Sequence, residues 1–192
     1  IYDCFDPARH VLSKLPELTG SCYVSCDYGT QNATVFLLWQ RERGSERWVC
    51  TREYYYSGRD QKRQKTDNEF SADLGKWLDG AVPRAVVVDP SAASFITELR
   101  KAGYSVKKAD NDVLDGIRQV STRLQSGELL FSSVCVHTEE EFQTYVWDEK
   151  SCARGIDKPV KDNDHCMDAV RYFVSTILCR GTVKLKTFKN GI

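Results

Sequence analysis

Three aspartates have surroundings that suit the binding of a metal ion. Asp27 and Asp89 each end a short apolar run, and Asp168 lies just before the apolar stretch of a late helix. Carboxylates at the ends of strands, joined by one from a packed helix, can converge on a divalent cation, and such hard oxygen ligands suit Mg²⁺ or Mn²⁺. The trio therefore indicates metal-dependent phosphodiester chemistry.

These residues could support a reaction that uses two metal ions. Two ions about 3.5–4 Å apart can flank a scissile phosphate, where one activates a water molecule and the other stabilises the leaving oxygen. In that scheme Asp27 and Asp89 supply the central ligands and Asp168 completes the set. His165 precedes Asp168 by three residues, so the two side chains share a helix face. Its imidazole can bind metal, bind phosphate or shuttle a proton near neutral pH.

Each carboxylate also has a structural interpretation. An aspartate at a strand end, such as Asp27, is often a turn former or a helix cap, and Asp89 before Pro90 is suited to capping a following helix. Asp164 is predicted to be the N-cap of the last helix, with its side-chain oxygen bonded to a backbone N–H, rather than a metal ligand. Asp168 differs, because an unpartnered carboxylate among apolar neighbours would be costly. The three aspartates together indicate a metal site more strongly than any one of them does alone.

The length and composition fit one globular domain. The chain has 192 residues, of which 41% are hydrophobic and 28% charged, enough for a substantial core without disulfide bonds. Lys+Arg and Asp+Glu both number 27, so the net charge does not indicate a nucleic-acid partner. The basic residues are nevertheless concentrated over 52–65, whereas 139–141 is acidic. The balanced total therefore argues only weakly against DNA.

The eight cysteines do not form a metal-binding pattern. No C-x-x-C pair occurs among them, and several fall on predicted strands and helices. Free thiols packed as small hydrophobic side chains are favoured over disulfide bonds. The sequence contains no apolar run of the ~20 residues needed to span a membrane and no signal peptide. These features favour a cytoplasmic location.

The alternation of apolar and polar segments predicts an α/β domain with a mixed sheet. Tight polar connections should join the first strands into an antiparallel meander, with strands at 22–27, 34–40 and 47–56. Further strands are predicted at 85–88, 104–107 and 128–131, and helices at 67–78, 93–101, 113–125 and 164–178. The expected organisation is an irregular lead-in or linker remnant over 1–20, the domain over 21–180 and a tail over 181–192.

Local signals predict where two of the helices begin. Asp112 is suited to capping the helix over 113–125. Thr138 and Glu141 have the spacing of a capping box at the start of another helix. The polar segment 149–161 is predicted to be a loop.

The order of elements explains how Asp27 and Asp89 can meet. The two aspartates lie close together if the first and fourth strands are adjacent and parallel. Parallel neighbours need a crossover connection, and the helix predicted over 67–78 provides one.

Four segments, in matching order, are similar to a known protein family. They are Asp-Tyr-Gly-Thr at 27–30, Asp-Pro-Ser-Ala-Ala-Ser-Phe at 89–95, Asn-Asp-Val-Leu-Asp-Gly-Ile-Arg at 111–118 and Asp-His-Cys-Met-Asp-Ala-Val-Arg-Tyr at 164–172. Together they resemble the C-terminal nuclease domain of the large terminase subunit of tailed bacteriophages, over about residues 20–178. The pattern Asp-His-x-x-Asp-Ala-x-Arg-Tyr is the most specific part.

The resemblance implies an RNase H-like fold and a metal-dependent endonuclease that cuts concatemeric viral DNA at the start and end of packaging. It implies that Asp27, Asp89 and Asp168 bind Mg²⁺ or Mn²⁺ and that His165 is an accessory active-site residue. The family's full subunit also has an N-terminal ATPase motor, but this sequence contains no G-x-x-x-x-G-K-[ST] motif. The implied partners are double-stranded DNA, a motor in the same polypeptide, the portal protein and the small terminase subunit, in the host cytoplasm.

The basic residues of two polar segments would have to contact the DNA. The alternative interpretation of these segments is that they are solvated loops. The candidates are Arg59, Lys62, Arg63, Lys65, Lys158 and Lys161.

Three other functions compete with this one. Actin-like ATPases and sugar kinases share the RNase H-like core, but they require a second Gly-rich phosphate loop that is missing here. Other RNase H-like nucleases, such as junction resolvases or transposase cores, would use the same carboxylates. A catalytically idle docking module for the portal or small subunit would not use them.

Overall fold

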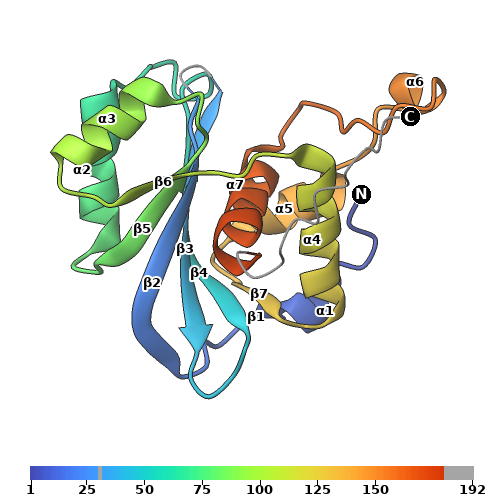
Figure 1. Cartoon of the computed structure of the whole chain (residues 1–192), viewed down its shortest axis with the longest axis horizontal. Helices are drawn as coiled ribbons and strands as arrows, with labels where there is room; N and C mark the ends of the chain where they lie inside the picture. Colours follow the sequence, from blue (N-terminus) through green and yellow to red (C-terminus); the bar gives the residue numbers. More distant parts are fainter. Residues whose placement is uncertain (30–31, 180–192) are drawn as a thin grey trace, which may run out of the picture.

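The fold is a single mixed sheet with helices on both faces (Figure 1), in a computed structural model that describes residues 1–29 and 32–179. The sheet in these residues has seven strands in the order β1-β7-β4-β3-β2-β5-β6. The strands are β1 (Val11–Leu12), β2 (Leu18–Asp27), β3 (Ala33–Glu42), β4 (Trp48–Ser57), β5 (Pro83–Val88), β6 (Val106–Lys108) and β7 (Leu129–Ser132). The helices are α1 (Pro7–His10), α2 (Asp67–Leu78), α3 (Ala93–Lys101), α4 (Val113–Gln125), α5 (Val136–Thr144), α6 (Glu149–Cys152) and α7 (His165–Phe173), which continues as a π-helical turn over Val174–Leu178.

The predicted meander and its crossover are confirmed. Strands β2, β3 and β4 pair antiparallel. β2 and β3 are longer than predicted, and β4 has the predicted length shifted by one residue. Helix α2 then leads to β5, which pairs parallel with β2 so that Cys26 lies opposite Val88. Because Asp27 and Asp89 directly follow these paired residues, they leave the sheet at the same edge.

The two faces of the sheet bury separate apolar cores. Successive side chains of a strand point to opposite faces. Phe36 and Leu38 of β3 therefore pack toward α2 and α3, whereas Leu37 and Trp39 pack toward α4, α5 and α7. The ring of Trp39 stacks on Phe173 with centroids 4.3 Å apart, which fixes α7 against the sheet.

Residues 1–20 differ from the irregular lead-in predicted. They contain α1 and β1, and β1 pairs parallel with β7. Tyr2 is buried in the core, and the ring of Phe5 stacks on Phe142 of α5 with centroids 4.2 Å apart. Pro7 is the first residue of α1 and Gly20 lies within β2, so neither prevents regular structure here. The aromatic side chains pack the segment against the domain.

The start of α5 is another correction. The helix begins at Val136 and no capping box forms between Thr138 and Glu141. The buried carboxylate of Glu53 on β4 accepts the N–H groups of His137 and Thr138 and the Thr138 hydroxyl instead. Strand β4 thus supplies the cap that local sequence signals assigned to the helix itself. The predicted Asp112 cap of α4 is confirmed, because its carboxylate accepts the Asp115 N–H at 2.9 Å.

The predicted loop over 149–161 contains the short helix α6. An isolated bridge between Trp147 and Pro159 closes its base, and the segment projects as an arm beside the domain (Figure 1). The predicted tail over 181–192 lies outside the described residues. Among the helices described, none is long and apolar enough to cross a membrane.

Candidate active site

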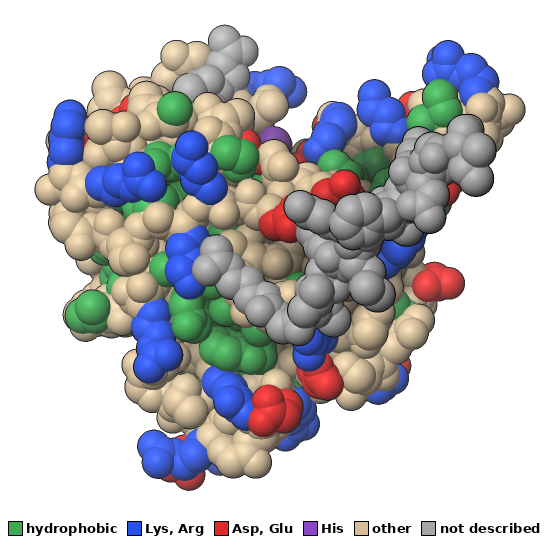
Figure 2. Space-filling model, viewed as in Figure 1, with side chains coloured by type: hydrophobic (Ala, Val, Ile, Leu, Met, Phe, Trp, Pro, Cys, Tyr) green, Lys and Arg blue, Asp and Glu red, His purple; other side chains and the backbone are tan. Residues whose placement is uncertain are grey.

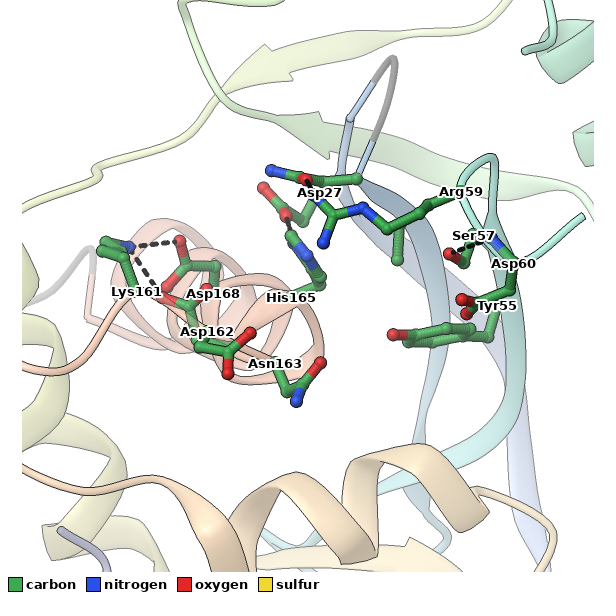
Figure 3. Close-up of a pocket in the computed structure, with 13 residues that line it drawn as sticks. Asp27, Tyr55, Ser57, Arg59, Asp60, Lys161, Asp162, Asn163, His165 and Asp168 are labelled. Atoms are coloured by element: carbon green, nitrogen blue, oxygen red, sulfur yellow. Dashed lines mark hydrogen bonds and ion pairs between the residues drawn. The ribbon is translucent and has the colours of Figure 1, made fainter. Parts of the chain in front are cut away.

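The three predicted aspartates line one cavity of about 290 Å³. Asp27 comes from the end of β2, Asp89 follows β5, and Asp168 lies in the first turn of α7. Asp27 and Asp168 also line a neighbouring cavity of about 470 Å³, which His165 borders as well (Figure 3). The structure therefore brings together all four residues that the sequence singled out for catalysis.

Asp27 and His165 form a hydrogen-bonded pair, with 2.9 Å between His165 Nδ1 and Asp27 Oδ2. Burial raises the pKa of Asp27 to about 6, although the hydrogen bond from His165 opposes this. Burial alone would lower the pKa of His165, but the hydrogen bond and the charge of Asp27 outweigh it and the net pKa is raised. The pair can therefore hold a proton between its two members near neutral pH.

Asp89 is held by three neutral donors. Its Oδ1 accepts the Ser91 N–H at 2.7 Å, and its Oδ2 accepts Asn111 Nδ2 at 3.1 Å and the Tyr172 hydroxyl at 3.0 Å. Burial opposes ionisation, but these hydrogen bonds outweigh it and the pKa of Asp89 is lowered. Helix α3 begins after Ala92, so Asp89 is not its cap. The ionised form of its carboxylate is therefore favoured, and the residue lines the same cavity as Asp27 and Asp168.

Asp168 lies between two cationic side chains. Its Oδ1 accepts a hydrogen bond from the buried guanidinium of Arg171, and its Oδ2 lies 3.1 Å from Lys161 Nζ. The Lys161 ammonium also lies 2.9 Å from Asp164 Oδ2. Burial would lower the pKa of Lys161, but Asp168 and Asp164 outweigh it and the pKa is raised. The ammonium therefore bridges two carboxylates (Figure 3).

The prediction that Asp164 caps α7 with its side chain is wrong. Asp164 occupies the N-cap position, but its side chain makes no capping hydrogen bond. Glu141 of α5 takes that role, because its Oε2 accepts the N–H groups of Cys166 at 2.7 Å and Met167 at 3.2 Å. Burial raises the pKa of Glu141 to about 8. A cap supplied from another helix leaves the Asp164 carboxylate to face Lys161.

The donor set suits a hard divalent cation. No three His, Cys, Asp or Glu side chains within the described ranges are already grouped as a metal-binding cluster. The oxygens that line the cavity are nevertheless carboxylates, which Mg²⁺ and Mn²⁺ prefer. Beside Asp168, the Lys161 ammonium occupies a position where a metal ion could bind. The residues present therefore fit the metal that the sequence predicted.

The six predicted DNA-binding residues fall into three groups. Arg59 and Lys161 line the larger cavity from opposite sides (Figure 3), and Arg59 also donates to Asn32 Oδ1 at 3.3 Å. Lys62 and Lys158 are exposed. The remaining two are paired within the domain, Arg63 with Glu69 and Lys65 with Asp73.

Basic side chains stand on both sides of the hollow that leads to the site. Figure 2 shows Lys and Arg on the domain and on the α6 arm, with acidic side chains and a histidine between them. Such an arrangement attracts phosphates to the rim while leaving acids at the centre.

Sequence reasoning missed several residues of the site. Arg171 and Tyr172 stand in the late motif, which is the signal by which they could have been found. Asn111 stands in another of the four motifs. The signal at Glu141, its capping-box spacing from Thr138, pointed to a different role, because its actual partners lie on α7.

The fold and site together define a class. A sheet of three antiparallel strands continued by parallel ones, with carboxylates at two adjacent strand ends and on a packed helix, is an RNase H-like domain of the terminase nuclease type.

Solved structures place the chain within that class. The large terminase from the thermophilic bacteriophage D6E is 51% identical, with a TM-score of 0.88 over 92% of this chain and 45% of that one. The same protein in complex with ADP gives a TM-score of 0.89 over 93% of this chain and 44% of that one. The chain belongs to the large terminase family and corresponds to its nuclease domain. It spans less than half the length of the D6E protein.

Two more distant structures share the fold. The P22 large terminase nuclease domain is 19% identical, with a TM-score of 0.71 over 91% of this chain and 90% of that one. The large terminase nuclease from thermophilic phage G20c with bound magnesium is 14% identical, with a TM-score of 0.61 over 85% of this chain and 84% of that one. No protein-family model and no curated protein matches the chain.

Proposed function

We propose that this domain is a metal-dependent endonuclease that cuts concatemeric viral DNA during genome packaging. The observation that carries the proposal is the convergence of Asp27, Asp89 and Asp168 on one cavity. Two adjacent strand ends and a packed helix hold these carboxylates, so a substrate phosphate would meet a fixed set of charges. Membership of the large terminase family supports the packaging role.

Asp27, Asp89 and Asp168 would hold Mg²⁺ or Mn²⁺, with two ions as the preferred stoichiometry. Bound there, divalent ions would supply a nucleophilic water at neutral pH and charge stabilisation for the leaving oxygen. The magnesium bound in the G20c nuclease supports the use of a divalent ion. The hydrogen bonds that ionise Asp89 also orient it for ligation.

His165 would move a proton. Its Nδ1 is engaged by Asp27, which fixes the ring and leaves Nε2 as the nitrogen that can exchange a proton with substrate or solvent. Because Asp27 stabilises the charged ring, the imidazole is a stronger base than a free histidine.

Double-stranded DNA would enter along the larger cavity. Arg59 and Lys161 would contact its phosphates directly, and the exposed Lys62 and Lys158 would add long-range attraction. Arg63 and Lys65 would contribute less, because they lie outside that cavity and pair with acidic residues of the domain.

The wider assembly follows from the family. The nuclease would work in one polypeptide with an ATPase motor, which the ADP complex of the longer D6E protein supports. The portal protein and the small terminase subunit would be its partners in the host cytoplasm.

Cleavage of plasmid DNA tests the proposal. The purified chain should nick or cut DNA with Mn²⁺ or Mg²⁺ and lose this activity in a chelator, and Asp89→Asn should abolish it with the fold intact by circular dichroism. Asp3→Asn, an exposed carboxylate outside both cavities, is the matched control. Full cleavage by Asp89→Asn would refute the metal assignment. A docking module would fail to cut DNA with any metal but would bind a partner protein. ATP hydrolysis by the purified chain would indicate a kinase-like protein.

A further inference from the structure

Lys161 is the one cation of the site that both touches two carboxylates and remains open to solvent, within the part of the chain described. We propose that its ammonium is a resident cation that a divalent metal must displace from Asp168, so that Lys161 sets the metal affinity of the domain. This inference rests on the proposed metal-dependent function. It assigns a role to Lys161 beyond the DNA contact suggested by its charge.

The two cations on Asp168 differ in how easily they can leave. The side chain of Arg171 is 1% exposed, whereas that of Lys161 is 51% exposed. Withdrawing a buried guanidinium would strand a charge in the core, which is strongly unfavourable. An ammonium at the cavity mouth can return to water on its flexible stem. Arg171 is therefore the permanent partner of Asp168, and Lys161 is the exchangeable one.

The negative charge at this side of the cavity requires a cation at all times. Asp164 and Asp168 both raise the pKa of Asp27 by repulsion, so the three carboxylates interact. His165 compensates Asp27 and Arg171 compensates Asp168. Asp164 does not cap α7, because Glu141 does, and Lys161 compensates its charge. Exchange of the ammonium for a divalent ion would keep a cation beside these carboxylates.

The backbone hydrogen bonds at the base of the α6 arm hold Lys161 in this position. The Val160 N–H donates to the Val146 carbonyl at 3.0 Å, and the Asp148 N–H donates to the Lys158 carbonyl at 2.8 Å. Lys161 follows this ladder directly, so its backbone is anchored while its side chain can swing. On leaving Asp168 the ammonium stays beside the cavity that Arg59 also lines, where a DNA phosphate would neutralise it.

Titration with Mn²⁺, followed by the electron paramagnetic resonance signal of the free ion, tests the proposal without DNA. Lys161→Gln should bind Mn²⁺ roughly two- to fivefold more tightly than the wild type, the change expected for loss of a partly exposed ion pair. Lys161→Arg keeps the charge and should bind as the wild type does. Lys150→Gln removes a charge from the same arm, away from the carboxylates, and is the matched control.

Thermal unfolding gives a second readout. Without metal, Lys161→Gln should melt below the wild type, because Asp164 and Asp168 lose a cation. Saturating Mn²⁺ should raise its melting temperature by more than it raises that of the wild type, since bound metal stabilises according to its affinity.

The outcomes separate this proposal from the proposed function. Equal or weaker Mn²⁺ binding by folded Lys161→Gln, in a wild-type protein that binds Mn²⁺ and cuts DNA, would overturn the role of Lys161 alone. Absence of Mn²⁺ binding in the wild type and every variant would overturn both. Lys161→Met, which retains an apolar stem, repeats the test if the Gln variant does not fold.

Discussion

The two walls of the active site are built in different ways. The sheet wall consists of Asp27 and Asp89, which follow paired residues of adjacent parallel strands and take their positions from the backbone ladder. The helix wall consists of Asp164, His165 and Asp168, which are held by side chains from outside α7 and by Arg171 within it. The sheet wall is therefore set by topology, and the helix wall is set by a network of buried charges.

Charge compensation differs in the same way. Asp89 on the sheet wall is held by neutral donors, so its ionisation needs no second charge. Asp168 on the helix wall is held by Arg171 and Lys161. The helix wall should therefore be sensitive to loss of any one partner, because each removal leaves a charge unmatched.

The largest expected effect contrasts one aspartate from each wall. Asp89→Asn and Asp168→Asn should each lower DNA cleavage by at least roughly 100-fold, since even partners of metal ligands matter by 10–100-fold. Asp168→Asn should also lower the free energy of unfolding by about 3 kcal/mol, because buried Arg171 loses its charged partner. Asp89→Asn should cost only about 1 kcal/mol. Equal losses in urea denaturation would contradict the difference between the walls.

The sheet wall is the part of the site that the sequence predicts well. The unbroken apolar run before Asp89 indicates a strand covered on both faces, and the helix after the meander allows β5 to lie beside β2. From these two features the meeting of Asp27 and Asp89 follows. Local pattern and chain connectivity are sufficient here because hydrogen-bonded strands place residues by register alone.

The helix wall shows where sequence reasoning stops. The motif placed His165 and Asp168 on one helix face, but the preference of Asp for N-cap positions led to the wrong role for Asp164. Glu141 overrode that preference from a separate helix. Such caps depend on how helices pack, which local spacing does not encode. The same cause explains the start of α5, where Glu53 replaced the predicted capping box.

A smaller effect tests whether Glu141 positions the helix wall. Glu141→Ala should destabilise the domain by about 1–2 kcal/mol, as for loss of a helix cap, and lower cleavage. Glu141→Gln keeps an acceptor for the N–H groups of Cys166 and Met167 and should preserve cleavage. The two variants separate the cap from the charge.

Because the Glu141 carboxyl group is buried and titrates, we expect the stability of the domain to depend on pH. Burial raises the pKa of Glu141 from 4.5 to about 8, so its contribution to stability is complete below the unfolded value and is lost as the pH rises through about 8. Glutamine does not titrate. The stability of Glu141→Gln relative to the wild type should therefore increase between about pH 5 and pH 8. A difference in urea midpoint that does not change with pH would show that the buried carboxylate carries no such penalty.

The smallest expected effect asks which basic residues serve DNA. Arg59 lines the larger cavity on the sheet side, whereas Arg63 pairs with Glu69 at the start of α2. In the inactive Asp89→Asn background, Arg59→Ala should weaken DNA binding and reduce the slope of log affinity against log salt by about 1, because one phosphate contact is lost. Arg63→Ala should change that slope less, since its charge is already compensated. Fluorescence anisotropy across a salt series measures both, and equal slopes for the two variants would mean that DNA approaches over α2 rather than through the cavity.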